Sequence, residues 1–88
     1  MYRVTVICSG LNDIEGSSSV SDILEEFTYR LWNMDTNCEW KDGILYFSAT
    51  NDFDKDRLAL LDEFGDAISA CINYSGNIQL AIEAVKTL

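Results

Sequence analysis

Residues 38–47 read CEWKDGILYF, an Asp-Gly pair between two runs rich in aromatic and β-branched residues. Asp-Gly is favoured in two-residue β-turns, where both central residues need a positive φ. This turn pairs Lys41 with Ile44. Counting from the turn gives the remaining cross-strand pairs: Trp40 with Leu45, Glu39 with Tyr46, and Cys38 with Phe47. The hairpin then has one bulky apolar face, so we expect Trp40 in the core, with a ligand-stacking role as the alternative.

Two more segments, one on each side of the hairpin, have the alternation of strands. Residues 2–9 predict a strand whose inward face holds Val4, Val6 and Cys8. Residues 78–85 predict a last strand with Ile78, Leu80 and Ile82 inward. The sheet therefore has four predicted strands.

Helical apolar spacing marks two further segments. Ser19 is the expected cap of the first helix, with Asp22 completing a capping box. Its apolar stripe comprises Val20, Ile23, Leu24, Phe27, Leu31 and Met34. Asp52 or Asp54 is the expected cap of the second helix, which ends at NYSGN (73–77). Its apolar stripe comprises Leu58, Leu61, Phe64, Ile68, Cys71 and Ile72.

The stretch NDFDKDRLALLDEF (51–64) also has the spacing of a calcium-binding loop. Asp52, Asp54, Asp56 and Glu63 would be the ligands. The sixth position of such a loop requires glycine for a sharp turn, but Arg57 occupies it here. The stretch therefore predicts the acidic start of a helix rather than a calcium site.

The element order is βαββαβ over a single domain, residues 1–88. Right-handed crossovers around a central hairpin predict an α+β, ferredoxin-like fold: a four-stranded antiparallel sheet with two helices packed on one face. A three-stranded sheet with the last strand placed elsewhere is the alternative. The uncovered sheet face should show Arg3, Thr5, Ile7, Glu39, Lys41, Ile44, Tyr46, Ser48, Gln79, Ala81 and Glu83. Its apolar centre, Ile7, Ile44, Tyr46 and Ala81, could pack a homodimer or a partner, and an ordinary solvated sheet face is the alternative.

The chain lacks the residues of several chemistries. It has three widely spaced cysteines and no histidine, which argues against a disulfide framework, a common zinc site and histidine-assisted nucleophilic catalysis. A carboxylate pair such as Asp62 and Asp66 would sit on a solvent face, where pKa values scarcely shift. We expect no enzymatic activity, no metal and no cofactor. Without a signal sequence or long apolar run, we expect a soluble, cytoplasmic protein with no membrane contact.

Charge is the strongest compositional signal. Fifteen acidic residues against six basic ones give a net charge of −9. Such a surface repels phosphates, so direct nucleic-acid binding is not expected, and only Tyr46 is placed to stack a base. A basic protein would be attracted, and solubility alone is the alternative explanation.

In size and charge the chain resembles small single-domain inhibitors of nucleases, namely toxin-immunity proteins and the anti-CRISPR or anti-restriction group. The resemblance involves no motif and assigns no residue. It implies a non-catalytic module that inhibits a basic, nucleic-acid-handling protein such as a nuclease. The alternatives are a small-molecule-binding regulatory domain, for which Gly10 in CSGLND is a weak sign, and a homodimeric structural module.

Two surfaces compete as the partner-binding site. The first is the acidic outer face of the helices: Asp22, Glu25, Glu26, Asp62, Glu63 and Asp66. Tyr29 follows Glu25 and Glu26 at helical spacing, so we expect it to share their face and to contribute binding energy. The alternative for Tyr29 is partial burial at the edge of the core. The second surface is the open sheet face around Ile44 and Tyr46.

Overall fold

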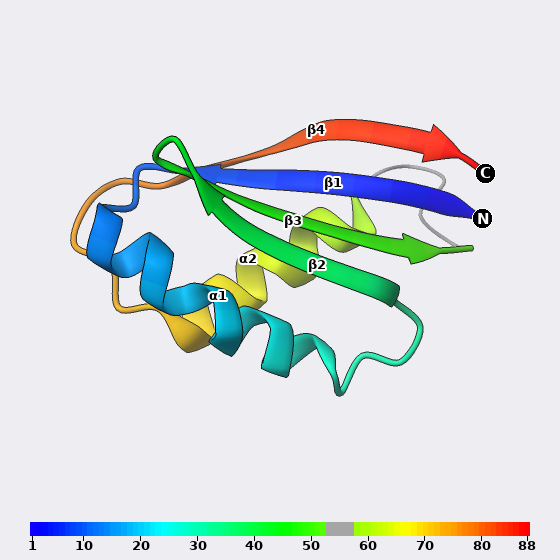
Figure 1. Ribbon diagram of the computed structural model, residues 1–88, viewed down its shortest axis with the longest axis horizontal. Coiled ribbons are helices and arrows are strands. Elements are labelled where there is room, and N and C mark those ends of the chain that lie inside the picture. Colours follow the sequence, from blue (N-terminus) through cyan, green and yellow to red (C-terminus); the bar gives the residue numbers. More distant parts are fainter. Residues whose placement is uncertain (53–57) are drawn as a thin grey trace.

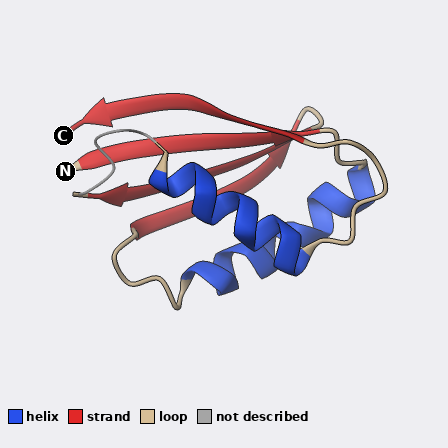
Figure 2. Cartoon of the chain, turned by 180° about the vertical axis from the view of Figure 1, so that it is seen from behind, coloured by secondary structure: helices blue, strands red, loops and turns tan. Residues whose placement is uncertain are grey.

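The computed structural model describes residues 1–52 and 58–88, and it has the α+β, ferredoxin-like fold that the sequence predicts (Figure 1). The elements in chain order are β1 (Tyr2–Ser9), α1 (Asp13–Phe27), β2 (Met34–Lys41), β3 (Ile44–Asn51), α2 (Ala59–Cys71) and β4 (Gln79–Thr87). Both helices lie on the same face of the sheet, which leaves the other face open (Figure 2). Within the described ranges, neither helix is long and apolar enough to cross a membrane.

The sheet has the strand order β2-β3-β1-β4, with every neighbouring pair antiparallel. The predicted hairpin register is confirmed at each position, from Lys41 opposite Ile44 to Cys38 opposite Phe47. Asp42 and Gly43 have φ values of 52° and 77°, the conformation that the Asp-Gly pair predicts. Because β4 pairs with β1, the three-stranded alternative is wrong.

A β-bulge lies where β4 pairs with β1. Val6 is opposite Ile82 and Thr5 is opposite Ala84, so Glu83 is the extra residue. The predicted inward residues Ile78, Leu80 and Ile82 all pack against the core. Beyond the bulge Val85 packs inward as well, and the strand continues to Thr87, two residues past its predicted end.

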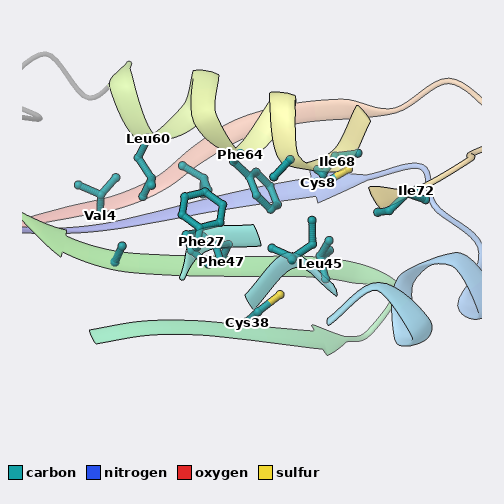
Figure 3. Packing of buried hydrophobic residues seen from close by; sticks show 14 of the residues in the cluster. Val4, Cys8, Phe27, Cys38, Leu45, Phe47, Leu60, Phe64, Ile68 and Ile72 are labelled. Atoms are coloured by element: carbon teal, nitrogen blue, oxygen red, sulfur yellow. The ribbon is translucent and has the colours of Figure 1, made fainter. Parts of the chain in front are cut away.

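The core fills the space between the sheet and the helices (Figure 3). Phe47 from the sheet lies between Phe27 of α1 and Phe64 of α2, with ring centroids 4.2 and 5.7 Å away. Around these rings lie the predicted inward residues of β1, which are completely buried. Offset aromatic contacts of this kind add to the stabilisation from apolar burial, so the two helices are held through one shared ring.

The predicted cap of α1 at Ser19 is wrong, because the helix is capped by Asn12, seven residues earlier. The Asn12 side chain accepts a hydrogen bond from the Glu15 amide at 2.8 Å, and Glu15 Oε1 accepts one from the Asn12 amide at 3.0 Å. This is a complete capping box. Within this helix, position 16 must be glycine, because a Cβ there would overlap the indole of Trp40. Trp40 packs over this glycine and is half-buried against the core rather than fully inside it.

The predicted end of α1 is also wrong. The helix ends at Phe27, with Thr28 as the C-terminal cap, so the apolar stripe stops there. Leu31 is 82% exposed in the connection, and Met34 begins β2 and is 43% exposed. Their helical spacing is therefore incidental to the packing.

Helix α2 begins at Ala59, after Leu58, whose side chain makes no capping hydrogen bond. Asp52 is exposed and does not cap the helix, and Asp54 lies outside the described residues. The helix ends at Cys71, before NYSGN, because Ile72 is already extended. Its fully buried residues are Leu60, Phe64, Ala67 and Ile68, whereas Leu58 is 56% exposed. Of the predicted stripe, Phe64, Ile68 and Ile72 are buried and Leu61 and Cys71 pack against the core, so only Leu58 is misplaced.

Candidate partner-binding surface

Charge is divided between the two layers of the molecule. The helices α1 and α2 contain eight of the fifteen acidic residues and none of the six basic ones. The four strands contain three acidic and three basic residues, Asp35, Glu39, Glu83 and Arg3, Lys41, Lys86. The helical layer is therefore strongly negative while the strands are neutral.

On α1, the predicted residues Asp22, Glu25 and Glu26 are all near enough to α2 for their charges to act on Cys71. The Cys71 thiol of α2 lies 3.7 Å from the backbone oxygen of Asp22, to which it donates. Burial raises the pKa of this thiol, and the negative charges of Glu26, Asp22 and Glu25 raise it further. The three predicted carboxylates therefore share, by their spacing of three and four residues, the part of α1 that lies near the end of α2.

The position of Glu25 opposes the stability of its own helix, whereas Glu26 is paired with Arg30. Glu25 and Glu26 lie in the last turn of α1, where the helix dipole favours cations, and the turn has no basic residue. Asp22 precedes them by three and four residues, a spacing at which like charges repel. Both ion pairs found within residues 1–52 and 58–88 involve Arg30, which lies 3.5 Å from Glu26 and 4.0 Å from Glu63.

On α2, Asp62 and Asp66 are exposed one turn apart, as predicted. Glu63 differs from them because its side chain is only 18% exposed. Its Oε1 accepts a hydrogen bond from Trp32 Nε1 and its Oε2 accepts one from Asn33 Nδ2, each at 2.7 Å. The expectation that Glu63 lies on the free acidic face is therefore wrong, since both oxygens are used to hold the connection between α1 and β2.

Tyr29 does not share a helix face with Glu25 and Glu26, because α1 ends two residues before it. The tyrosine is 75% exposed, so the alternative of a tyrosine at the edge of the core is wrong as well. Trp32, which no sequence pattern singled out, is 50% exposed in the same connection. Glycine and proline are both missing from residues 28–33, so no ordinary stop signal marks the end of the helix.

The open sheet face has a polar hollow of about 260 Å³ lined by Thr5, Asn37, Glu39, Lys41, Tyr46, Ser48 and Glu83. Beside it, the Arg3 guanidinium donates to Ser48 Oγ at 3.0 Å and to Thr50 Oγ1 at 3.1 Å. Ile7, Ile44 and Tyr46 are half-buried there, and Ala81 is exposed. The face is mixed, as predicted, and its hollow is polar.

The cysteines are poorly suited to nucleophilic or metal chemistry. Burial raises the pKa of Cys8 to about 11, and burial together with the charge of Glu39 raises that of Cys38 to about 12. Such thiols carry little thiolate near neutral pH. Within residues 1–52 and 58–88 no three metal-binding side chains gather, whereas Asp54, Asp56 and Arg57 of the rejected calcium loop lie outside these residues.

The site geometry therefore offers an acidic helical layer, an exposed aromatic connection at its end, and a polar hollow on the opposite face. Comparison with protein families, with curated sequences and with solved structures finds no match to this chain.

Proposed function

We propose that the chain is a non-catalytic binding module whose acidic helical layer engages and inhibits a basic, nucleic-acid-handling protein such as a nuclease. One observation carries this proposal: eight carboxylates and no basic residue on the two helices, beside a neutral set of strands. A one-signed surface steers an oppositely charged partner to one face and increases the rate of association.

The position of the acids supports binding over plain solubility. Net charge keeps a protein soluble wherever on the surface the charged residues lie. Here Glu25 and Glu26 occupy the helix end at which negative charge is unfavourable. Residues that lower stability where they lie are typical of functional surfaces.

The proposed type of protein is an inhibitor of the anti-CRISPR, anti-restriction or toxin-immunity kind, acting in the cytoplasm. The free cysteines Cys8, Cys38 and Cys71 suit a reducing compartment. The high pKa values of Cys8 and Cys38 and the lack of histidine support a role without catalysis.

The test is capture of purified nucleases by the immobilised protein at low and high salt, followed by assay of nuclease activity. The panel should comprise a CRISPR effector, restriction endonucleases and toxin nuclease domains, with acidic enzymes of similar size as controls. We expect one basic nuclease to be captured, inhibited and released as salt rises. Capture of no basic nuclease, or capture indifferent to salt, would sink the proposal.

A small-molecule-binding regulatory domain is the second candidate function, and the polar hollow on the open sheet face favours it. Its lining combines one ammonium group, on Lys41, with two carboxylates, on Glu39 and Glu83. Such a site suits small polar ligands that carry positive charge. A ligand screen by thermal shift checks this candidate, because a ligand of the native state raises the melting temperature, and Tyr46→Ala should abolish the rise.

A further inference from the structure

Four large apolar side chains are exposed within six residues at the end of α1. Leu31 is 82% exposed, Tyr29 75%, Trp32 50% and Met34 43%. Single exposed apolar residues are ordinary, but a run of them on one short segment indicates an interaction site. These four residues, here called the apolar set, lie at the periphery of the molecule, where the chain passes from α1 to β2 (Figures 1 and 2).

The segment that carries the apolar set is tied to the rest of the fold by hydrogen bonds. The Arg30 amide donates to Phe27 O at 3.1 Å and the Asn33 amide donates to Arg30 O at 3.0 Å. The buried Asn33 side chain donates to Glu63 and accepts from Asn51 Nδ2 at 3.2 Å. A binding segment that is ordered before association loses less conformational entropy when its partner arrives.

Two further contacts orient side chains within this segment, those of Trp32 and Arg30. The Trp32 indole donates to Glu63, which orients its ring while leaving half of it exposed. The Arg30 guanidinium lies 5.4 Å from the centre of the Phe27 ring, so the one basic residue of the segment is directed at the core. The exposed part of the segment is therefore apolar rather than basic.

We propose that the apolar set inserts into an apolar hollow on a protein partner, and that lysine or arginine residues border this hollow. The inference rests on the proposed function and adds the contact that supplies binding energy. The expected basic border of the partner's hollow follows from the acidic residues on both sides of the apolar set. Glu25 and Glu26 lie in the last turn of α1 before the set, and Asp35 follows it in β2. Exposed tyrosine and tryptophan are the residues most often found to dominate binding energy in interfaces.

Charge selects this occupant over two others. Nucleic acid would bring phosphates against the flanking carboxylates, and a second copy would bring carboxylates against carboxylates on a chain of net charge −9. A basic protein surface brings attraction at the border and apolar contact at the centre, the usual arrangement of a protein interface.

The experiment compares two defined probes against the whole ¹⁵N-labelled chain by NMR. One probe is a peptide of leucine and lysine, and the other is oligolysine of the same net charge. We expect the leucine–lysine peptide to shift the amide signals of residues 28–34 and the Trp32 indole signal, at low and high salt alike. Oligolysine should shift only signals near the α1 carboxylates and be released by salt. The Trp40 indole, which packs against Gly16, serves as the internal reference.

Leu31→Ser should weaken binding of the leucine–lysine peptide by about tenfold, the loss typical of an interface anchor. Ile14→Ser is the matched control, since Ile14 is 80% exposed at the opposite end of α1, and it should bind like the parent. Equal affinity of both variants and the parent would overturn the inference and leave the proposed function standing. If oligolysine also failed to shift any α1 signal, the proposed function would fail. A dimer in sedimentation that Leu31→Ser dissociates would make a second copy the occupant and contradict the inference.

Discussion

The two oxygens of the Glu63 carboxylate each accept one hydrogen bond, from Trp32 and from Asn33. Asn33 is 6% exposed and would leave a polar group without a partner if this carboxylate were lost. One acidic residue on α2 therefore fixes the course of a segment some thirty residues earlier in the chain. At the scale of single residues, Glu63 is a positioning residue and not part of the binding surface itself.

Glu63→Gln tests this role. The amide of glutamine offers one acceptor where two donors need one each, so one hydrogen bond is lost, at a cost of about 1–3 kcal/mol in the free energy of unfolding. Urea unfolding measures this cost, and the indole signal of Trp32 should move toward that of a free indole. Asp66→Asn makes the same chemical change at an exposed residue of the same helix beyond its first turn, and it should alter stability by less than about 0.5 kcal/mol. Equal effects of the two variants would contradict the positioning role.

The buried thiols predict a loss of stability in alkali. Burial raises the pKa of Cys8 from 9.0 to about 11 and that of Cys38 from 9.0 to about 12. Above pH 9.0 the unfolded chain therefore loses these thiol protons while the folded protein keeps them. The contribution of the thiols to stability is complete below pH 9.0 and is lost as pH rises toward the folded pKa values. Urea unfolding over this pH range measures the fall. Replacing both residues by valine should make the fall smaller, and an unchanged fall would show that other groups cause it.

At the scale of elements, α1 has acidic residues at both ends. Asp13 and Glu15 lie in the first turn, where negative charge is favourable, and Glu25 and Glu26 lie in the last turn, where it is unfavourable. The same kind of side chain thus has opposite effects on one helix, depending on its position.

Glu25→Lys and Asp13→Lys make the same charge change at opposite ends of α1. The first should stabilise the protein by about 0.3–1 kcal/mol and the second should destabilise it by a similar amount, and salt should reduce both effects. Chemical denaturation at low and high salt measures these differences. If Glu25→Lys were destabilising, the acidic last turn would contribute to folding, and the case for a binding role would lose its support.

Elements with a local signal could be predicted from the sequence. The hairpin register follows from Asp42-Gly43 alone, because the turn type fixes every later pair. The sequence misplaces the start of α1, because its capping box lies in a stretch rich in glycine and serine, which is typical of a loop. One of these glycines, Gly16, is needed inside the helix because the Trp40 indole packs against it. The course of the chain after α1 includes hydrogen bonds from Trp32 and Asn33 to Glu63 on another helix, which no local pattern encodes.

The candidate site was predictable to the same degree. The exposed carboxylates Asp22, Glu25, Asp62 and Asp66 follow from helical periodicity, which requires only the helix interior to be correct. Helical spacing predicts Leu31 and Met34 in the core, because it continues the stripe, but both residues lie beyond the end of α1. The apolar set can therefore be recognised only from the position at which α1 ends.

At the scale of the whole molecule, the fold separates charge that the sequence mixes. Acidic residues occur throughout the chain, but packing both helices on one face of the sheet brings eight of them into one layer. The charged strand residues of the opposite face are two basic and two acidic ones, so their charges cancel: Arg3, Lys41, Glu39 and Glu83. A charged partner would therefore meet two distinct surfaces on the same small protein.

Association kinetics with the captured nuclease can tell these two surfaces apart. Two variants with the same net charge are needed: Asp22→Lys with Glu25→Lys on the helical layer, and Glu39→Lys with Glu83→Lys on the open sheet face. Stopped-flow mixing at several salt concentrations gives the association rate constant of each. We predict that the helical variant associates at least about tenfold more slowly at low salt and loses most of its salt dependence, while the sheet variant stays near the parent. Equal slowing of both variants, or slowing of the sheet variant alone, would contradict binding through the acidic helical layer.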